Sequence, residues 1–140
     1  MKLAVAIADS TAPDSAFVVW RGFEDSLRKA AEFGYHGVEL ALKDQEDVDA
    51  QALSRLLGRY GLEVSCISTG QVFAVKGLAL SHPEPDVRDR TVATFCGLIE
   101  LARDFGGDAP ALLGGRLARK RVGMGVNRPR RRRRRILPDA

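Results

Sequence analysis

One carboxylate of this chain lies within an apolar segment, where its charge is unfavourable unless it is paired. Glu39 is the only charged residue in the otherwise apolar run 37–42. A carboxylate in such a run needs a hydrogen-bonding partner, such as a hydroxyl or Arg21, or a functional role. Cys66 and Cys96 also lie inside apolar stretches. We predict that both cysteines are buried free thiols in a reducing cytoplasm, rather than a disulfide or metal ligands.

The second feature with evident chemistry is a run of six arginines at residues 130–135. From Arg116 onward the chain has eleven basic residues and one acid, which leaves eleven basic and seventeen acidic residues in 1–115. The body is therefore acidic and the tail strongly basic. Such a tail would bind phosphates through counterion release. Because no aromatic residues are interleaved to stack on bases, its binding of nucleic acid would be unspecific.

Apolar patterning predicts three strands that alternate with three helices. Gly34 and Gly61 are well placed as left-handed C-terminal caps, and Pro85 as a first-turn residue. Asp47 or Asp49 can cap the second helix. The predicted strands are 3–8, 37–42 and 62–68; the predicted helices are 23–33, from Asp47 or Asp49 to near Gly61, and 85–105, with a long loop over 69–83.

The alternation of strands and helices implies a parallel sheet with right-handed crossovers. This pattern does not distinguish an open doubly wound sheet from part of a closed barrel. No Gly-x-Gly-x-x-Gly follows the first strand and no Walker A sequence occurs, so a nucleotide-binding open sheet lacks its usual support. The third helix is expected to bury one apolar stripe, formed by Val92, Phe95, Cys96, Ile99 and Ala102.

Local phrases resemble one known family. Residues 30–40 read Ala-Ala-Glu-Phe-Gly-Tyr-His-Gly-Val-Glu-Leu, with His36 where the family phrase often has Asp. Residues 64–73 and 80–85 are similar to its third strand and following loop, and residues 98–106 to its third helix. Through residue 107 the chain thus resembles sugar phosphate isomerases and epimerases of the xylose-isomerase-like (β/α)8 barrel superfamily. That superfamily, to which AP endonuclease family 2 belongs, also includes endonuclease IV-type DNA repair enzymes.

The resemblance implies an α/β fold, a partial TIM barrel of about three βα units with parallel strands, plus an irregular basic tail. Active sites of such barrels lie at the carboxyl ends of the strands. Several alternatives stay open: a structural partner or a metal bond for Glu39, capping for the loop residues, and helix entry for His82. Residues 20–21 either cover a sugar face and bind a phosphate or form a surface loop. The implied substrate-binding residues are Glu39, Thr69, Gln71 and His82, with Asp9, Ser10, Ser68 and Gly70 at the same ends.

The family commonly moves a proton next to a carbonyl, using a divalent metal and two carboxylates. Its metal ligands come from the second half of the barrel, so we expect no metal-binding or catalytic residue in this chain and a divalent metal only in the full-length family. Residues 108–140 keep little of a fourth strand, where Pro110 would be awkward. A frameshift near codons 107–111 would explain this. We therefore predict a barrel part at 1–107 and an irregular, disordered Arg-rich tail at 108–140.

These patterns predict a cytoplasmic fragment of a metal-dependent sugar or sugar phosphate isomerase or epimerase, inactive as this chain. No apolar run reaches the roughly 18 residues of a membrane span, and we predict no signal peptide and no membrane partner. The exposed edge of an incomplete sheet predicts self-association. The alternative is a non-enzymatic protein that binds polyanions or nucleic acid through its Arg-rich tail.

Overall fold

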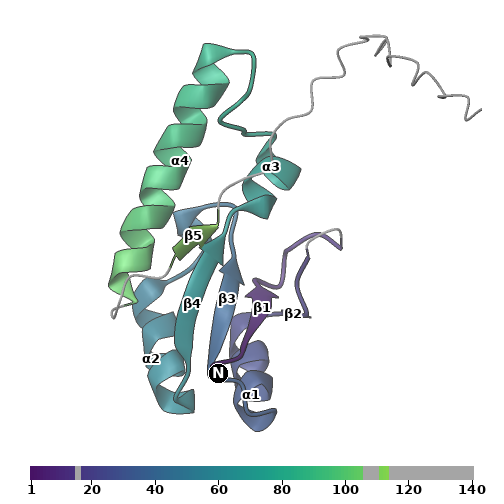
Figure 1. Cartoon of the computed structure of the whole chain (residues 1–140), viewed down its shortest axis with the longest axis vertical. Coiled ribbons are helices and arrows are strands. Elements are labelled where there is room, and N and C mark those ends of the chain that lie inside the picture. Colours follow the sequence, from purple (N-terminus) through teal and green to yellow (C-terminus); the bar gives the residue numbers. More distant parts are fainter. Residues whose placement is uncertain (15–16, 106–110, 114–140) are drawn as a thin grey trace, which may run out of the picture.

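The computed structural model describes residues 1–14, 17–105 and 111–113. The strands are β1 (Ala4–Ala8), β2 (Trp20–Arg21), β3 (Gly37–Ala41), β4 (Glu63–Ser68) and β5 (Ala111–Leu113). The helices are α1 (Phe23–Glu32), α2 (Ala50–Tyr60), α3 (Gly70–Lys76) and α4 (Pro85–Asp104), with a 3-10 turn, η1, at Gln45–Asp47. The sheet has the order β2-β1-β3-β4-β5, and every neighbouring pair is parallel. The arrows of β1, β3 and β4 point toward the end of the molecule where α3 and the β1–β2 connection lie (Figure 1).

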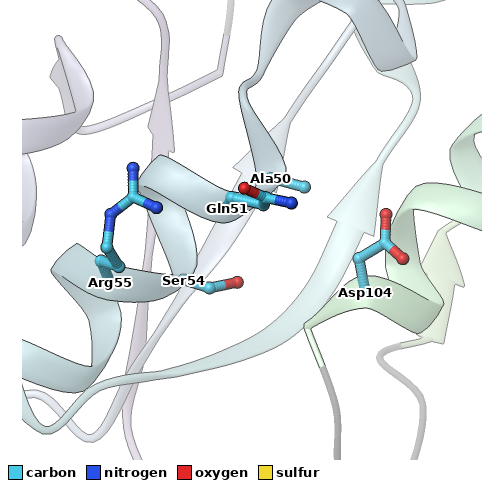
Figure 2. A pocket seen from close by; sticks show the side chains of 5 residues that line it. All are labelled: Ala50, Gln51, Ser54, Arg55 and Asp104. Carbon is cyan, nitrogen blue, oxygen red and sulfur yellow. The ribbon is translucent and has the colours of Figure 1, made fainter.

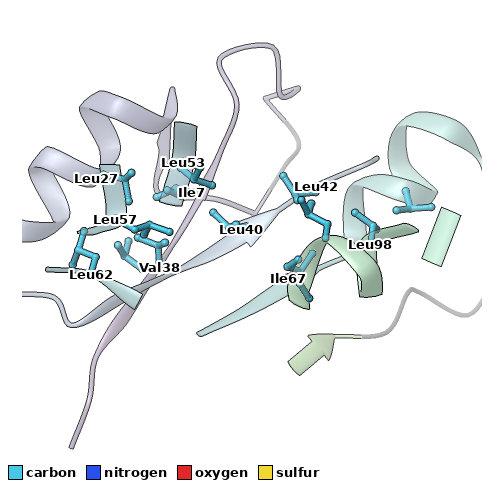
Figure 3. Close-up of a cluster of buried hydrophobic side chains, with 14 of the residues drawn as sticks. Ile7, Leu27, Val38, Leu40, Leu42, Leu53, Leu57, Leu62, Ile67 and Leu98 are labelled. Carbon is cyan, nitrogen blue, oxygen red and sulfur yellow. The ribbon is translucent and has the colours of Figure 1, made fainter. Parts of the chain in front are cut away.

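One apolar core joins α1, α2 and α4 to a single face of the sheet. In β3, Val38 and Leu40 are fully buried in this core. Glu39 between them points to the opposite face, because successive side chains of a strand alternate. Burial of each large aliphatic side chain contributes roughly 1.5–3 kcal/mol. The fully buried members drawn in Figure 3 include Ile7, Leu27, Val38, Leu40, Leu42, Ile67 and Leu98.

The long helices lie on one side of the sheet. This arrangement distinguishes part of a barrel from an open doubly wound sheet. Strands β1, β3, β4 and β5 follow one another both along the chain and across the sheet. Right-handed crossovers between such strands all return on the same side, whereas a doubly wound sheet carries helices on both faces. The uncovered face is therefore the inner face of an opened barrel. This architecture confirms the predicted partial TIM barrel with parallel strands.

The predicted caps are confirmed at both ends of α2. The Asp49 side chain accepts a hydrogen bond from the backbone N–H of Ala52 at 2.9 Å. Gly61 ends the helix with φ 65°, a left-handed conformation that costs glycine little. Gly34 likewise follows α1 with φ 76°. The β1, β3 and β4 ends lie within one residue of the predicted strand ends.

Two elements near the carboxyl ends of the strands were not predicted. Helix α3 replaces the first half of the predicted loop 69–83. With seven residues it is too short for apolar periodicity to reveal it, and Gly77 ends it with φ 66°. Residues 20–21, predicted as a surface loop or a sugar cover, form the edge strand β2. Backbone N–H groups of Val19 and Gly22 donate to the carbonyls of Ala6 and Ala8 at 2.8 and 2.9 Å, which covers that part of the β1 edge.

A short fourth barrel strand of three residues remains where the sequence indicated little of one. Strand β5 pairs with β4 in parallel, with Ala111 opposite Cys66 and Leu113 opposite Ser68. The described strand begins at Ala111, and Pro110 lies outside the described residues. The sheet thus contains the strands of the three predicted βα units, β1, β3 and β4, followed by a fourth barrel strand, β5. The predicted boundary at residue 107 and the predicted disorder of the Arg-rich tail lie outside the described residues.

The predicted buried stripe of α4 was wrong for three of its five residues. Val92 and Ile99 are 49% and 48% exposed, and Cys96 is exposed as well. The buried side of the helix instead carries Thr91, whose hydroxyl donates to the carbonyl of Val87 at 2.7 Å. This internal bond removes the cost of placing a hydroxyl in the core. Neither α4 nor any other helix in the described part of the chain is long and apolar enough to cross a membrane.

Candidate active site at the carboxyl ends of the strands

The β1–β2 connection packs on the inner face of the sheet near the carboxyl ends of β1 and β3. Ala12 of this connection packs on Ala8 of β1 and Ala41 of β3, with Val18 beside them. Arg21 fixes the connection, since its guanidinium donates to the carbonyls of Ala12 and Pro13 at 3.1 and 2.9 Å. The packed alanine side chains are small, and the polar residues that follow β1, β3 and β4 lie near them at the carboxyl ends of the strands.

Glu39 lies on the inner face in register with Ala6 of β1 and Cys66 of β4. It is half-buried, and it interacts with the half-buried Cys66 thiol. Burial raises the pKa of Cys66, and the neighbouring charge and hydrogen bond of Glu39 raise it further. The Arg21 guanidinium, one of the partners considered for Glu39, donates instead to the carbonyls of the β1–β2 connection. The Glu39 carboxylate therefore faces the barrel interior beside a thiol.

Lys43 is the centre of the polar cluster at this end of the sheet, and sequence reasoning missed it. Its Nζ donates to Asp47 Oδ1 at 2.6 Å and lies 3.6 Å from Asp9 Oδ2. The hydrogen bond with Asp47 raises the pKa of Lys43, so the side chain is an ammonium donor and not a base. Burial alone would raise the pKa of Asp9, but hydrogen bonds from Thr11 and the charge of Lys43 lower it below 3.8.

The turn after β3 holds Lys43 in place. Asp47 Oδ2 accepts the backbone N–H groups of Lys43 and Asp44 at 2.9 and 3.0 Å, which closes η1 as a capping box. Asp44 pairs in turn with Lys76 at the end of α3, and this hydrogen bond lowers the pKa of Asp44. The signal in the sequence was a lysine directly after a buried strand, followed four residues later by an aspartate.

Gln71 reaches from α3 to the end of β3. It is 3% exposed, and its Nε2 donates to the carbonyl of Ala41 at 2.7 Å. Its Oε1 is buried without a hydrogen-bond partner, as is Asp9 Oδ2. Thr69 is fully buried at the N-cap position of α3. The structure thus brings Asp9, Thr69 and Gln71 to the ends of the strands above Glu39, as the sequence predicted.

His82 is not brought to this cluster. It stands in the connection between α3 and α4, where its Nδ1 accepts the backbone N–H of Glu84 at 3.2 Å. Arg88 of α4 donates to the carbonyl of His82 at 2.8 Å. These contacts organise the first turn of α4, which is the helix-entry alternative for this residue.

A separate hollow of about 480 Å³ lies in the helical layer, between α2 and the end of α4. Figure 2 shows Gln51 and Ser54 on α2 on the side of Asp104, which stands at the end of α4. The sheet core separates this hollow from the inner face, so it is not part of the candidate site.

A comparison with protein families agrees with the architecture. A sequence model of the xylose isomerase-like TIM barrel family matches residues 27–140. The chain belongs to this family. The match includes β3, β4, β5, α2 and α4. Its bounds extend through the Arg-rich residues. No curated protein matches the chain in the comparison made.

Membership in the xylose isomerase-like family raises the question of a divalent metal. Within residues 1–14, 17–105 and 111–113, no three His, Cys, Asp or Glu side chains converge as a metal site requires. Asp9 and Asp47 are both engaged by Lys43, whose ammonium would repel a cation. These residues therefore do not fit the metal that the family resemblance implies, and any such ion needs ligands from elsewhere.

Proposed function

We propose that this chain carries the amino-terminal part of a sugar or sugar phosphate isomerase or epimerase and supplies the part of the active site that holds the substrate. The observation that supports this most directly is the convergence of Asp9, Lys43 and Gln71 at the carboxyl ends of neighbouring parallel strands. Active sites of TIM barrels are built at this end. Glu39 lies on the inner face below them.

Each of these side chains suits a particular part of a carbonyl sugar. The Lys43 ammonium can donate to a carbonyl or hydroxyl oxygen, and it stays protonated because its pKa is raised by the hydrogen bond with Asp47. Asp9 and Gln71 offer acceptors for hydroxyl groups. None of these groups pairs with a second free carboxylate to exchange a proton beside the carbonyl. We therefore expect the chain to bind a substrate and not to turn it over.

The test is binding and turnover measured on the full chain. Isothermal titration with D-xylose, D-ribulose and D-ribulose 5-phosphate should show binding of at least one sugar, with a dissociation constant on the order of 1 mM, or about −4 kcal/mol. NMR in deuterated water with added Mn²⁺ or Mg²⁺ should show no exchange of sugar C–H for C–D. Failure of all three sugars to bind would contradict the proposal, and rapid exchange would contradict the predicted inactivity.

The Arg-rich residues support a second candidate, a non-enzymatic protein that binds polyanions or nucleic acid. Residues 116–140 carry eleven basic residues and one acid. If the six arginines at 130–135 each neutralise one phosphate, the logarithm of the affinity for duplex DNA should fall with log salt with a slope of about −5. Fluorescence polarisation of labelled duplexes of unrelated sequence tests this. Replacing residues 130–135 with serine should reduce the magnitude of the slope by about 5, and an unchanged slope would assign the binding to another part of the chain.

A further inference from the structure

The outward face of α4 carries apolar side chains that nothing in the described part of the chain covers. Val92 and Ile99 are 49% and 48% exposed, and Cys96 between them is exposed as well. The spacings of four and three positions place these residues on one side of the helix. Helix α4 stands along one side of the molecule (Figure 1). Apolar side chains that form a line on such a helix, rather than a scatter, are typical of a surface that packs against another helix.

One charged residue stands at each end of this line. Asp89 lies three positions before Val92, and Arg103 lies four positions after Ile99. Both charged residues are exposed, and neither forms an ion pair within residues 1–14, 17–105 and 111–113. The outer stripe of α4 therefore consists of Asp89, Val92, Cys96, Ile99 and Arg103. Its alternating spacings of three and four are those by which two α-helices pack along a common seam.

The outer stripe is complementary to itself when two copies of α4 run antiparallel. Asp89 and Arg103 are each seven positions from Cys96. A two-fold axis beside Cys96 would place Asp89 of one copy opposite Arg103 of the other, and the symmetry would repeat this pair at the other end. Val92 of each copy would lie beside Ile99 of the other. Such a contact is closed, because both copies use the same surface.

Charge favours a second copy over the chain's own carboxyl-terminal residues as the occupant of the outer stripe. Residues 116–140 carry eleven basic residues and one acid. They would attract Asp89 but place like charges against Arg103. A second copy supplies an opposite charge at both ends and apolar side chains between them.

We propose that the outer stripe of α4 is a self-association surface on which two copies of the chain pack antiparallel, with Asp89 of each copy facing Arg103 of the other. This surface is separate from the open sheet edge and from the candidate sugar site, so the inference does not rest on the proposed function. At about 1.5 Å per residue, the stripe is about 21 Å long. One helix pair of this length makes a small interface, so we expect a dissociation constant on the order of 100 µM.

Sedimentation velocity of the full chain tests this surface. Between about 5 and about 300 µM the wild type should pass from monomer to dimer and associate no further. Asp89→Arg and Arg103→Asp each set like charges opposite one another at both ends of the stripe, so each variant alone should dimerise about tenfold more weakly or worse. An equimolar mixture of the two variants should recover the dimer, because every acid then faces a base. Arg90→Asp reverses a charge on another side of α4 and is the matched control, which should dimerise as the wild type does.

Three outcomes would overturn the inference. The wild type could stay monomeric throughout, as it would if residues 114–140 of the same chain covered the stripe. Association could survive both charge reversals or continue beyond two copies, which would assign it to the open sheet edge. The mixture of variants could fail to recover the dimer although circular dichroism shows both to be folded. Ile99→Lys serves if a charge variant does not fold: it should weaken dimerisation but leave the free energy of unfolding of the monomer, measured at about 1 µM, unchanged, and undiminished dimerisation would contradict the proposal.

Discussion

Replacing Lys43 with Met removes the charge at the centre of the polar cluster while keeping an aliphatic side chain. The side chains of Lys43, Asp9 and Asp47 are 24%, 14% and 9% exposed. The substitution would leave two mostly buried carboxylates without their shared cation. Removing one partner of a fully buried ion pair costs about 3–5 kcal/mol. Because Lys43 is partly exposed and solvent screens its charge, we expect the free energy of unfolding to fall by about 2 kcal/mol at pH 7.

The pH dependence of this difference follows from the sign of each pKa shift. The folded-state pKa of Asp9 lies below 3.8, so its stabilising contribution is present above pH 3.8 and is lost as the pH falls through the folded-state value. The folded-state pKa of Lys43 lies above 10.5, so its contribution is present below pH 10.5 and is lost as the pH rises through the folded-state value. The difference in the free energy of unfolding between wild type and Lys43→Met should therefore be largest between these pH limits and should decrease in acid.

Urea unfolding, followed by circular dichroism and by the fluorescence of the single tryptophan, Trp20, measures this gap at pH 7 and pH 3. Lys29→Met is the control, since Lys29 makes an exposed ion pair with Asp25 one helical turn away on α1. Its loss should change stability far less. An unchanged free energy of unfolding for Lys43→Met, or a loss of the same size at both pH values, would refute the assignment of Lys43 as a partly buried structural cation.

Three further predictions concern the sheet and α4. A Cβ at Gly37 would lie 2.5 Å from a backbone carbonyl of β4, so Gly37→Ala should lower the free energy of unfolding by about 1–3 kcal/mol in urea titration; Gly97→Ala meets only a flexible glutamine side chain and should cost less. Burial and a neighbouring carboxylate raise the pKa of Cys66, so iodoacetamide at pH 8 should alkylate it about tenfold more slowly than the exposed Cys96, as mass spectrometry would show; equal rates would contradict the burial of Cys66. Ile99→Lys should leave the free energy of unfolding within about 0.5 kcal/mol of wild type. A large loss of stability would instead indicate that Ile99 is buried, as the sequence predicted.

The main elements could be predicted because their signals are local. The apolar runs of β1, β3 and β4 and the cap at Gly61 depend on a few neighbouring residues, and each was found within one residue of its position. The short elements could not be found in this way. Strand β2 exists because the carbonyls on one side of β1 require donors, and nothing in residues 20–21 themselves indicates a strand.

The buried face of α4 could not be predicted for a different reason. Apolar residues occur on more than one side of this 20-residue helix, so periodicity alone offers two stripes. Thr91 reads as polar in the sequence, but its hydroxyl is satisfied inside the helix and can be buried. Packing on the sheet therefore selects the side that carries Leu98 and Leu101, and leaves Ile99 exposed.

The position of the candidate site could be predicted from the sequence, but the set of residues that form it could be predicted only in part. The order of strands and helices was enough to place Asp9, Glu39 and Gln71 at one end or face of the sheet. Lys43 was missed because its role depends on a contact with Asp9, 34 positions earlier in the chain. His82 was included because it follows β4 in sequence, although α3 carries the chain away before residue 82.

The most direct test of the central claim is an NMR map of sugar binding. Titration of D-ribulose into the ¹⁵N-labelled chain should shift the amide signals of residues 9–11, 41–44 and 69–71 together, with a common dissociation constant, and should shift the side-chain amide of Gln71 with them. Signals of the hollow between α2 and α4 should stay in place. Saturable shifts confined to that hollow, or no shifts at any sugar concentration, would contradict a sugar site at the carboxyl ends of the strands.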